Sequence, residues 1–188
     1  MNANVETQKL TVAEFHHMEF DDADTHLYEL LDGDLVRKKA PSPQHQLVLG
    51  ELAFSLHTYV KQQQLGEILF APVDVFLDEY TAPQLDLVFV PQSNASIITR
   101  DGVMGIPALV VEVISPSSVY RDRVTKKELY ARFGVQEYWL VDSADGFIEI
   151  VTLQEGRYQL LSAASTEEGQ LTSGVLPGLT LDLNALFV

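Results

Sequence analysis

The sequence predicts an α/β protein (an α+β arrangement) with one central mixed β-sheet flanked by helices. A nearly continuous apolar run at 108–114, a helical segment at 121–133 and an apolar run at 137–141 form a strand–helix–strand unit. Such a unit is expected to be a right-handed crossover between parallel strands. A long amphipathic helix at 43–65 supplies a cover for one face of the sheet. The 188 residues contain no linker and no internal repeat, so we expect a single domain.

The first elements are a short helix and a β-hairpin. Thr11 and Glu14 have the spacing of a capping box, which predicts a helix that starts at this point. The runs 27–31 and 34–36 then flank Asp32-Gly33, a pair that favours a tight hairpin turn.

The long helix has the clearest signals in the chain. Ser42 is a suitable N-cap, Pro43 suits the first helical position, and Gly66 is expected to end the helix. Its apolar positions recur at helical spacing and form one continuous face: Leu49, Leu52, Ala53, Leu56, Tyr59 and Val60.

The remaining elements are strands and one helix. Runs at 67–78 and 85–90 have strand character, and the apolar run at 108–114 is typical of a strand that is covered on both faces. The helix at 121–133 is closed by Gly134. We expect a further hairpin from 147–152 and 157–161 across Glu155-Gly156, then turns and one short strand around Pro177-Gly178.

Composition excludes several classes of protein. A hydrophobic fraction of 46% with dispersed Gly and Pro excludes a disordered or fibrous chain. No apolar run reaches about 18 residues, so no membrane helix is expected. The N-terminus lacks a basic region followed by an apolar one, and the chain has no cysteine, which excludes disulfides and thiolate chemistry. We therefore expect a soluble cytoplasmic protein without a membrane partner.

The charge is strongly acidic but unevenly distributed. Twelve Lys and Arg against 27 Asp and Glu give a net charge of −15, which repels nucleic acid at long range. Eight of the twelve cations nevertheless fall in two short segments, so a local positive patch is compatible with the sequence: Arg37, Lys38, Lys39, Arg121, Arg123, Lys126, Lys127 and Arg132.

Two carboxylates interrupt otherwise apolar strands, where an unpaired charge is costly. Asp86 opens the run 87–90, and Glu112 lies between Val111 and Val113. If their strands are adjacent, the two acids could bind a hard divalent cation such as Mg²⁺ through oxygen. The alternatives are a salt bridge at a strand end for Glu112 and a turn residue for Asp86.

Other candidate residues have simple structural interpretations. Asp122 and Lys126 have i, i+4 spacing, and on spacing alone they form a surface ion pair worth about 0.2–0.5 kcal/mol. The functional alternative has Lys126 pointing back to the end of the strand that bears Glu112. Glu29 is most simply a solvent-facing hairpin residue, and His45 a helix-start residue. The other histidines lack the spacing of a zinc site.

The chain contains a succession of short motifs: Tyr28-Glu29-Leu30-Leu31-Asp32-Gly33-Asp34-Leu35-Val36, Pro41-Ser42-Pro43-Gln44-His45, Asp86-Leu87-Val88-Phe89-Val90, Glu112-Val113-Ile114-Ser115-Pro116-Ser117, Asp122-x3-Lys126-x3-Tyr130 and Gly134-Val135-Gln136-Glu137-Tyr138-Trp139-Leu140-Val141-Asp142. This succession resembles the Uma-type endonuclease family of the PD-(D/E)XK restriction-endonuclease-like superfamily. The resemblance implies a nuclease-like core at 10–160 and a C-terminal extension at 161–188 within one domain spanning 1–188.

The resemblance also implies roles for individual residues. Asp86 and Glu112 match the metal-binding acids, and the backbone carbonyl of Val113 falls where the superfamily often offers a third ligand. The superfamily's lysine two residues after the acid is Ile114 here, and in this family the lysine lies on the following helix, at Lys126. Glu29 matches an acid of the first hairpin that serves as an extra ligand or supports the metal. The catalytic set is therefore Asp86, Glu112, Lys126 and Glu29.

The implied activity is Mg²⁺-dependent hydrolysis of DNA phosphodiester bonds, with Mn²⁺ as a substitute and a homodimer as a common assembly of related nucleases. One alternative is a non-catalytic member in which the same fold serves as a binding or regulatory module. Another is hydrolysis of a smaller phosphate ester, which suits the net charge better. The retention of Asp86, Glu112 and Lys126 together favours the endonuclease.

Overall fold

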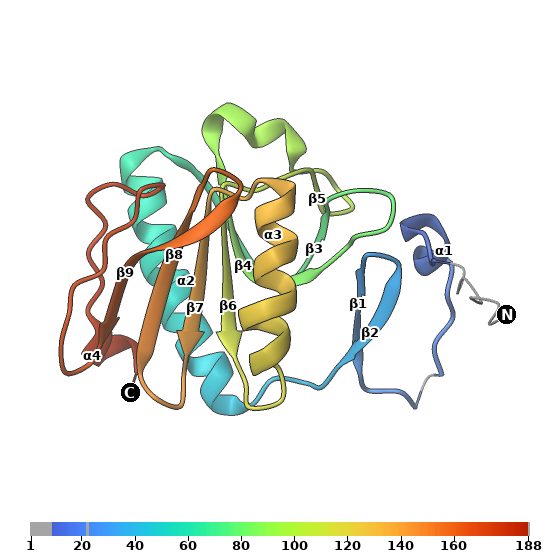
Figure 1. The fold of residues 1–188 in the computed structure, drawn as a ribbon, viewed down its shortest axis with the longest axis horizontal. Coiled ribbons are helices and arrows are strands. Elements are labelled where there is room, and N and C mark those ends of the chain that lie inside the picture. The colour runs from blue at the N-terminus through green and yellow to red at the C-terminus, as the bar shows by residue number, and fades with distance from the viewer. Residues whose placement is uncertain (1–8, 22, 188) are drawn as a thin grey trace, which may run out of the picture.

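The computed structural model describes residues 9–21 and 23–187 and shows a mixed sheet flanked by helices (Figure 1). Its elements are α1 (Val12–His16), β1 (Leu27–Leu31), β2 (Asp34–Lys38), α2 (Pro43–Gln63), β3 (Gly66–Phe76), β4 (Gln84–Pro91), the 3₁₀ helix η1 (Gln92–Ile97), β5 (Val103–Met104), β6 (Leu109–Ile114), the π-helix η2 (Arg121–Lys126), α3 (Lys127–Phe133), β7 (Glu137–Asp142), β8 (Phe147–Gln154), β9 (Arg157–Ser165) and α4 (Leu183–Leu186).

The sheet has seven strands in the order β5-β3-β4-β6-β7-β8-β9, and β1 and β2 form a separate hairpin. Strands β6 and β7 are parallel, as the strand–helix–strand unit predicts, whereas β4 pairs with β6 and β7 with β8 in antiparallel orientation. The predicted fold class is therefore confirmed. The short strand β5 and the helix η1 lie outside the predicted elements because they are too brief to show a hydrophobic period.

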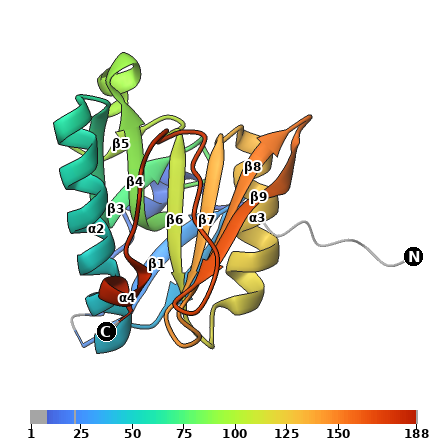
Figure 2. The ribbon, with the colours of Figure 1, turned by 90° about the vertical axis from the view of Figure 1, so that its left-hand side faces the viewer.

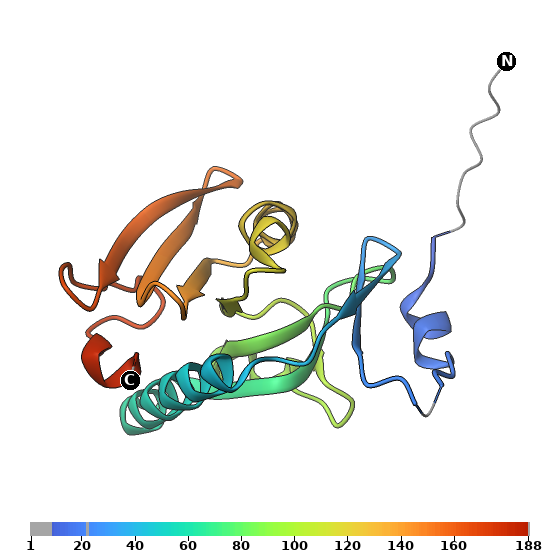
Figure 3. The same cartoon turned by 90° about the horizontal axis from the view of Figure 1, so that it is seen from below.

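Helices cover both faces of the sheet. Helices α2 and α4 lie on one side, and α3 lies on the other (Figures 2 and 3). Successive side chains of a strand point to opposite faces, so β4 and β6 contribute to two cores. The core beneath α2 contains Leu87, Phe89, Leu109, Val111 and Val113, and the core beneath α3 contains Val88, Val90, Val110 and Ile114.

The capping residues seen in the sequence predict the start of α2 correctly but not its end. The Ser42 hydroxyl accepts a hydrogen bond from the His45 N–H, and Pro43 occupies the first helical position, as predicted. The helix ends earlier than expected, because Gln64 is its left-handed C-cap. Gly66 instead begins β3, where a Cβ would lie 2.1 Å from the Val90 carbonyl oxygen.

The C-terminal segment packs onto the core beneath α2 through Leu176, Leu179, Leu183 and Leu186. The prediction of a short strand near the C-terminus is wrong. Within residues 166–187 the structure has no named strand, and the helix α4 forms instead. Asp182 caps this helix by accepting hydrogen bonds from Asn184 and Ala185. No helix within the described part of the chain is long and apolar enough to cross a membrane.

A buried carboxylate joins the C-terminal segment to the sheet. Glu137, at the start of β7, is fully buried and accepts hydrogen bonds from Trp139 Nε1 at 2.7 Å and Ser173 Oγ at 2.6 Å. The backbone N–H groups of Gly174 and Val175 donate to its other oxygen at 2.8 and 3.3 Å. Donors therefore surround both carboxylate oxygens, so this position requires an acceptor-only side chain.

We expect Glu137→Gln to lower the free energy of unfolding by about 1.5–3 kcal/mol, because the amide NH₂ faces donors and charge-assisted hydrogen bonds are lost. Urea denaturation followed by the fluorescence of Trp139, the only tryptophan, measures this change. Ser173→Ala removes only one hydrogen-bond donor to Glu137 and should lower the free energy of unfolding by less. A Glu137→Gln protein that unfolds at the wild-type urea concentration would contradict this role.

Candidate active site

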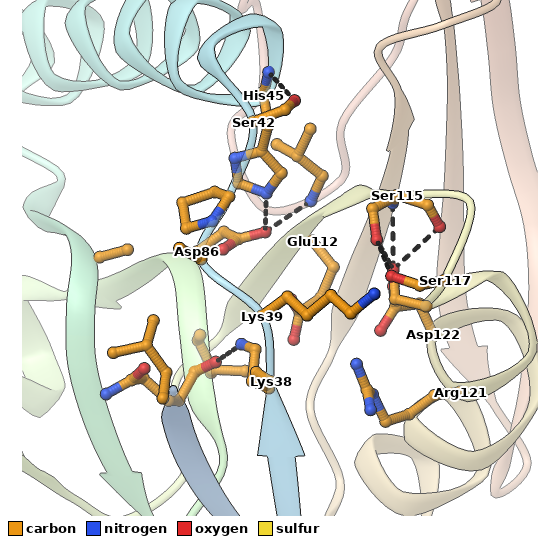
Figure 4. Close-up of a pocket in the computed structure, with 18 of the residues that line it drawn as sticks. Lys38, Lys39, Ser42, His45, Asp86, Glu112, Ser115, Ser117, Arg121 and Asp122 are labelled. Carbon is orange, nitrogen blue, oxygen red and sulfur yellow. Dashed lines mark hydrogen bonds and ion pairs between the residues drawn. The ribbon is translucent and has the colours of Figure 1, made fainter. Parts of the chain in front are cut away.

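A cavity of about 530 Å³ opens where the start of α2, the starts of β4 and η2 and the end of β6 meet (Figure 4). It is lined by two of the sequence-predicted carboxylates, Asp86 and Glu112, together with Lys126 and the backbone of Val113. The sequence-predicted residue Glu29 reaches this group through Lys126, its ion-pair partner.

Asp86 and Glu112 come together because their strands are antiparallel neighbours. The last paired residues of β4 and β6 are Leu87 and Val111, so Asp86 and Glu112 are the next residues along the two strands, at the same end of the pair. Both are buried, with exposures of 8% and 3%. The alternative interpretation of Asp86 as a turn residue is therefore wrong, since it lies within β4.

Asp86 is held as an anion by two partners. His45 Nε2 lies 3.2 Å from Asp86 Oδ2, and the Val113 N–H donates to the same oxygen at 2.8 Å. Burial alone raises the pKa of Asp86, but His45, the Lys38 charge and the Val113 N–H together lower it below its ordinary value. Asp86 is thus fixed in position and remains charged near neutral pH.

Glu112 has a different environment. Lys126 Nζ donates to Glu112 Oε1 at 2.7 Å, and the Tyr130 hydroxyl donates to the same oxygen at 3.0 Å. Burial raises the pKa of Glu112 to about 7; Lys126 opposes the rise, and the nearby charge of Asp86 adds to it. The carboxylates of Asp86 and Glu112 therefore differ in proton affinity, an arrangement common at catalytic sites.

Lys126 joins three elements through its ammonium group. Lys126 Nζ lies 2.7 Å from Glu112 Oε1 and 3.0 Å from Glu29 Oε2, and the side chain is 1% exposed. Burial lowers the pKa of Lys126, but the carboxylates of Glu112, Glu29 and Asp122 raise it above the ordinary value. Lys126 therefore stays protonated and acts as a charge rather than as a base.

Two structural interpretations from the sequence are wrong here. Glu29 is fully buried rather than solvent-facing, because the hairpin of β1 and β2 packs against η2 and β4. Asp122 and Lys126 are both buried, so they are not a surface pair, and the ion pairs of Lys126 within the described residues are with Glu29 and Glu112. Burial raises the pKa of Asp122.

The helical segment begins with a π-helical turn, Arg121–Lys126, before it continues as α3. A π-helix has i→i+5 hydrogen bonds, which change the direction of side chains relative to an α-helix, and such turns occur frequently at functional sites. Here the turn directs both Asp122 and Lys126 into the protein. Spacing arguments based on an α-helix could not predict this.

Three further residues of this region were not predicted as site residues from the sequence. His45 orients Asp86, and its Nδ1 is buried without a hydrogen-bond partner among the described residues. Arg121 and Lys38 face Glu29 at 3.6 and 3.9 Å. The only signal for His45 was its place in the Pro41–His45 motif, and nothing local in the sequence links it to Asp86.

The donors of the cavity are those that a hard cation prefers. Within residues 9–21 and 23–187, no group of three or more His, Asp or Glu side chains forms a complete metal site. Asp86 and Glu112 offer carboxylate oxygens, and the Val113 carbonyl points to the same side of β6 as its N–H, toward Asp86. Few protein oxygens together with water suit Mg²⁺, whereas the absence of cysteine and of clustered histidine argues against zinc.

Comparison with known proteins identifies the family of this chain. The model of the Uma2 family, described as "Putative restriction endonuclease", matches residues 12–184. A solved structure, "a putative nuclease belonging to DUF820" from Anabaena variabilis ATCC 29413, shares the fold with a TM-score of 0.73 and 16% identity over 95% of this chain and 97% of that chain. No curated protein matches. Because the family model spans nearly the whole chain, the protein belongs to the Uma2 family of restriction-endonuclease-like proteins.

Proposed function

We propose that the protein is a Mg²⁺-dependent endonuclease that hydrolyses DNA phosphodiester bonds at the cavity containing Asp86 and Glu112. The observation that carries this proposal is the buried Lys126, whose Nζ lies 2.7 Å from Glu112 Oε1, in a cavity that Asp86 also lines. Two acids and one ammonium suit the hydrolysis of a phosphodiester, because the acids hold a cation and the ammonium offsets negative charge.

Asp86, Glu112 and the Val113 carbonyl would hold the ion, with Mn²⁺ as a substitute. Mg²⁺ bound there would supply Lewis-acid chemistry, polarising the scissile phosphate and lowering the pKa of water. His45 keeps Asp86 oriented through Oδ2, which leaves Oδ1 available to the cavity. Metal ligands usually have such supporting partners, and removing one typically weakens metal binding by about 10–100-fold.

Lys126 would position the attacking water or stabilise the charge that develops on the phosphate. Its ammonium has three donors, pairs with Glu112 and Glu29, and lines the cavity. Glu29 would support this role from behind the cavity, because it pairs with the ammonium at 3.0 Å, is fully buried and does not line the cavity. Burial raises the pKa of Glu29, but the charges of Lys126, Lys38 and Arg121 lower it below its ordinary value.

DNA is the substrate that the family description favours, and cations gather at the cavity. Lys38, Lys39, Arg121 and Lys126 line it together with three carboxylates, whereas the whole chain carries −15. Binding that relies on a local cationic surface should be salt-sensitive. We propose a cytoplasmic location, where DNA is accessible, and keep the homodimer as a prediction that sedimentation can test.

Mg²⁺ and Mn²⁺ should bind the wild-type protein, and the heat of binding should disappear in both Asp86→Asn and Glu112→Gln, because each variant lacks one anionic ligand. Isothermal titration calorimetry measures this without any assumption about the substrate. Asp101→Asn, an exposed carboxylate outside the cavity, is the matched control. Cleavage of plasmid DNA in Mg²⁺ and in EDTA completes the test. Equal heats in all four proteins would exclude this pair as the metal site and favour a non-catalytic module.

The affinity for Mg²⁺ should rise between pH 6 and pH 8. The proton and the cation compete for Glu112, whose pKa is about 7, whereas Asp86 is already ionised throughout this range because its pKa is lowered. Calorimetry in buffers of different ionisation enthalpy should detect release of up to one proton per ion at pH 6 and almost none at pH 8. An affinity independent of pH would show that Glu112 is not the titrating ligand.

Lys126→Met should destabilise the protein by about 3–5 kcal/mol, because it leaves buried carboxylates without their counter-charge. Adding Glu29→Gln removes one of these charges and should recover part of that loss in urea denaturation. The double variant should still lack DNA hydrolysis, since the ammonium is absent. Recovery of both stability and hydrolysis would mean that Lys126 has only a structural role.

A further inference from the structure

We propose that a second hollow, between α3 and the turn of the β8–β9 hairpin, binds backbone phosphates of the DNA that is cut in the first cavity. This inference rests on the proposed function. The hollow has a volume of about 550 Å³ and is called the α3–β9 hollow below. Figures 1 and 3 show the turn of the hairpin beside α3.

The charge of the α3–β9 hollow is opposite to that of the protein. Four of the twelve cations line it, Arg123, Lys127, Arg132 and Arg157, together with a single carboxylate, Glu128. Four other cations, Lys38, Lys39, Arg121 and Lys126, line the active-site cavity, together with the carboxylates of Asp86, Glu112 and Asp122. Two thirds of the positive side chains thus border two hollows of an acidic protein, which is the distribution expected if a polyanion contacts both.

The hollow is built on ordered backbone. Glu155 and Gly156 have positive φ angles of 50° and 76°, as a tight two-residue hairpin turn requires, and they present Arg157 at the start of β9. The Tyr158 hydroxyl donates to the Val135 carbonyl at 2.8 Å and thereby ties the hairpin to the end of α3. The small side chain of Ala131 leaves space between them.

The cations of the hollow are only partly neutralised by carboxylates. Arg123 and Lys127 share one carboxylate, Glu149, at 2.9 and 3.5 Å, so the trio keeps an excess positive charge. Arg157 is exposed and forms none of the ion pairs found in the described part of the chain, although Arg132 pairs with Asp32. Arginine binds phosphate through two parallel N–H donors, which suits Arg123 and Arg157 to a DNA backbone.

The two hollows share one helical segment. Lys126 lines the active-site cavity, and Arg123, Lys127 and Arg132 of the same segment line the α3–β9 hollow. Residues before and after Lys126 thus border the second hollow, so we expect DNA bound at the first cavity to pass close to it.

The test compares Arg157→Gln with Arg100→Gln, a matched control that removes an equally exposed arginine outside both hollows. Fluorescence anisotropy measures binding of the full chain to a labelled DNA duplex in EDTA between 50 and 200 mM salt. Loss of one phosphate contact should reduce the slope of log K against log salt by about 0.9. That corresponds to affinity about eightfold weaker at 0.1 M salt, if the affinity extrapolated to 1 M is unchanged.

The slope should fall in Arg157→Gln, and Arg100→Gln should keep the wild-type slope. Equal slopes for the two variants would overturn the inference. A second outcome would also overturn the inference. The two variants would have equal DNA slopes, while inorganic phosphate at constant ionic strength would raise the melting temperature of the wild type but not that of Arg157→Gln. That result would assign the hollow to a free anion. Parallel hydrolysis in Mg²⁺ separates the proposals. A changed slope without hydrolysis contradicts only the activity, and hydrolysis with equal slopes contradicts only the second phosphate contact.

Discussion

The ammonium of Lys126 is the group on which the active-site region depends. It lies 2.7 Å from Glu112 and 3.0 Å from Glu29, and all three side chains are almost completely buried. Charges removed from water are tolerated only when each has a close partner of opposite sign. The β1–β2 hairpin, strand β6 and the η2–α3 helix therefore assemble around one shared cation, and the stability of this region is coupled to the geometry that the proposed reaction needs.

Strand order brings the acids to that cation. Because β4 runs antiparallel to β6, the start of one strand lies beside the end of the other, and Asp86 becomes a neighbour of Glu112. The parallel step from β6 to β7 requires a crossover, and the helix of that crossover supplies Lys126 and Tyr130 to the same face. The N-terminus of α2 adds His45 at the same edge. Four separate segments thus meet at one cavity.

Charge is organised locally rather than globally. A chain with a net charge of −15 has no long-range attraction for DNA, yet its cations border the active-site cavity and the α3–β9 hollow. The cations of the η2–α3 segment are divided between the two hollows. Lys126 is buried in the protein, whereas Arg123 and Lys127 pair with Glu149 on β8. A polyanion contacting both hollows would meet positive charge along its path.

The sequence by itself determined the elements and the identity of the unusual carboxylates. Caps, turns and hydrophobic periods are local, so the Asp32-Gly33 turn, the helix start at Ser42 and most of the strands could be predicted, and an acid within an apolar strand is visible without any structure. Only the tertiary structure decided the partners. Glu29 and Lys126 have local spacings typical of exposed residues, and they are buried because distant segments fold over them. His45 gained its role from a contact 41 residues away, which local sequence patterns cannot encode.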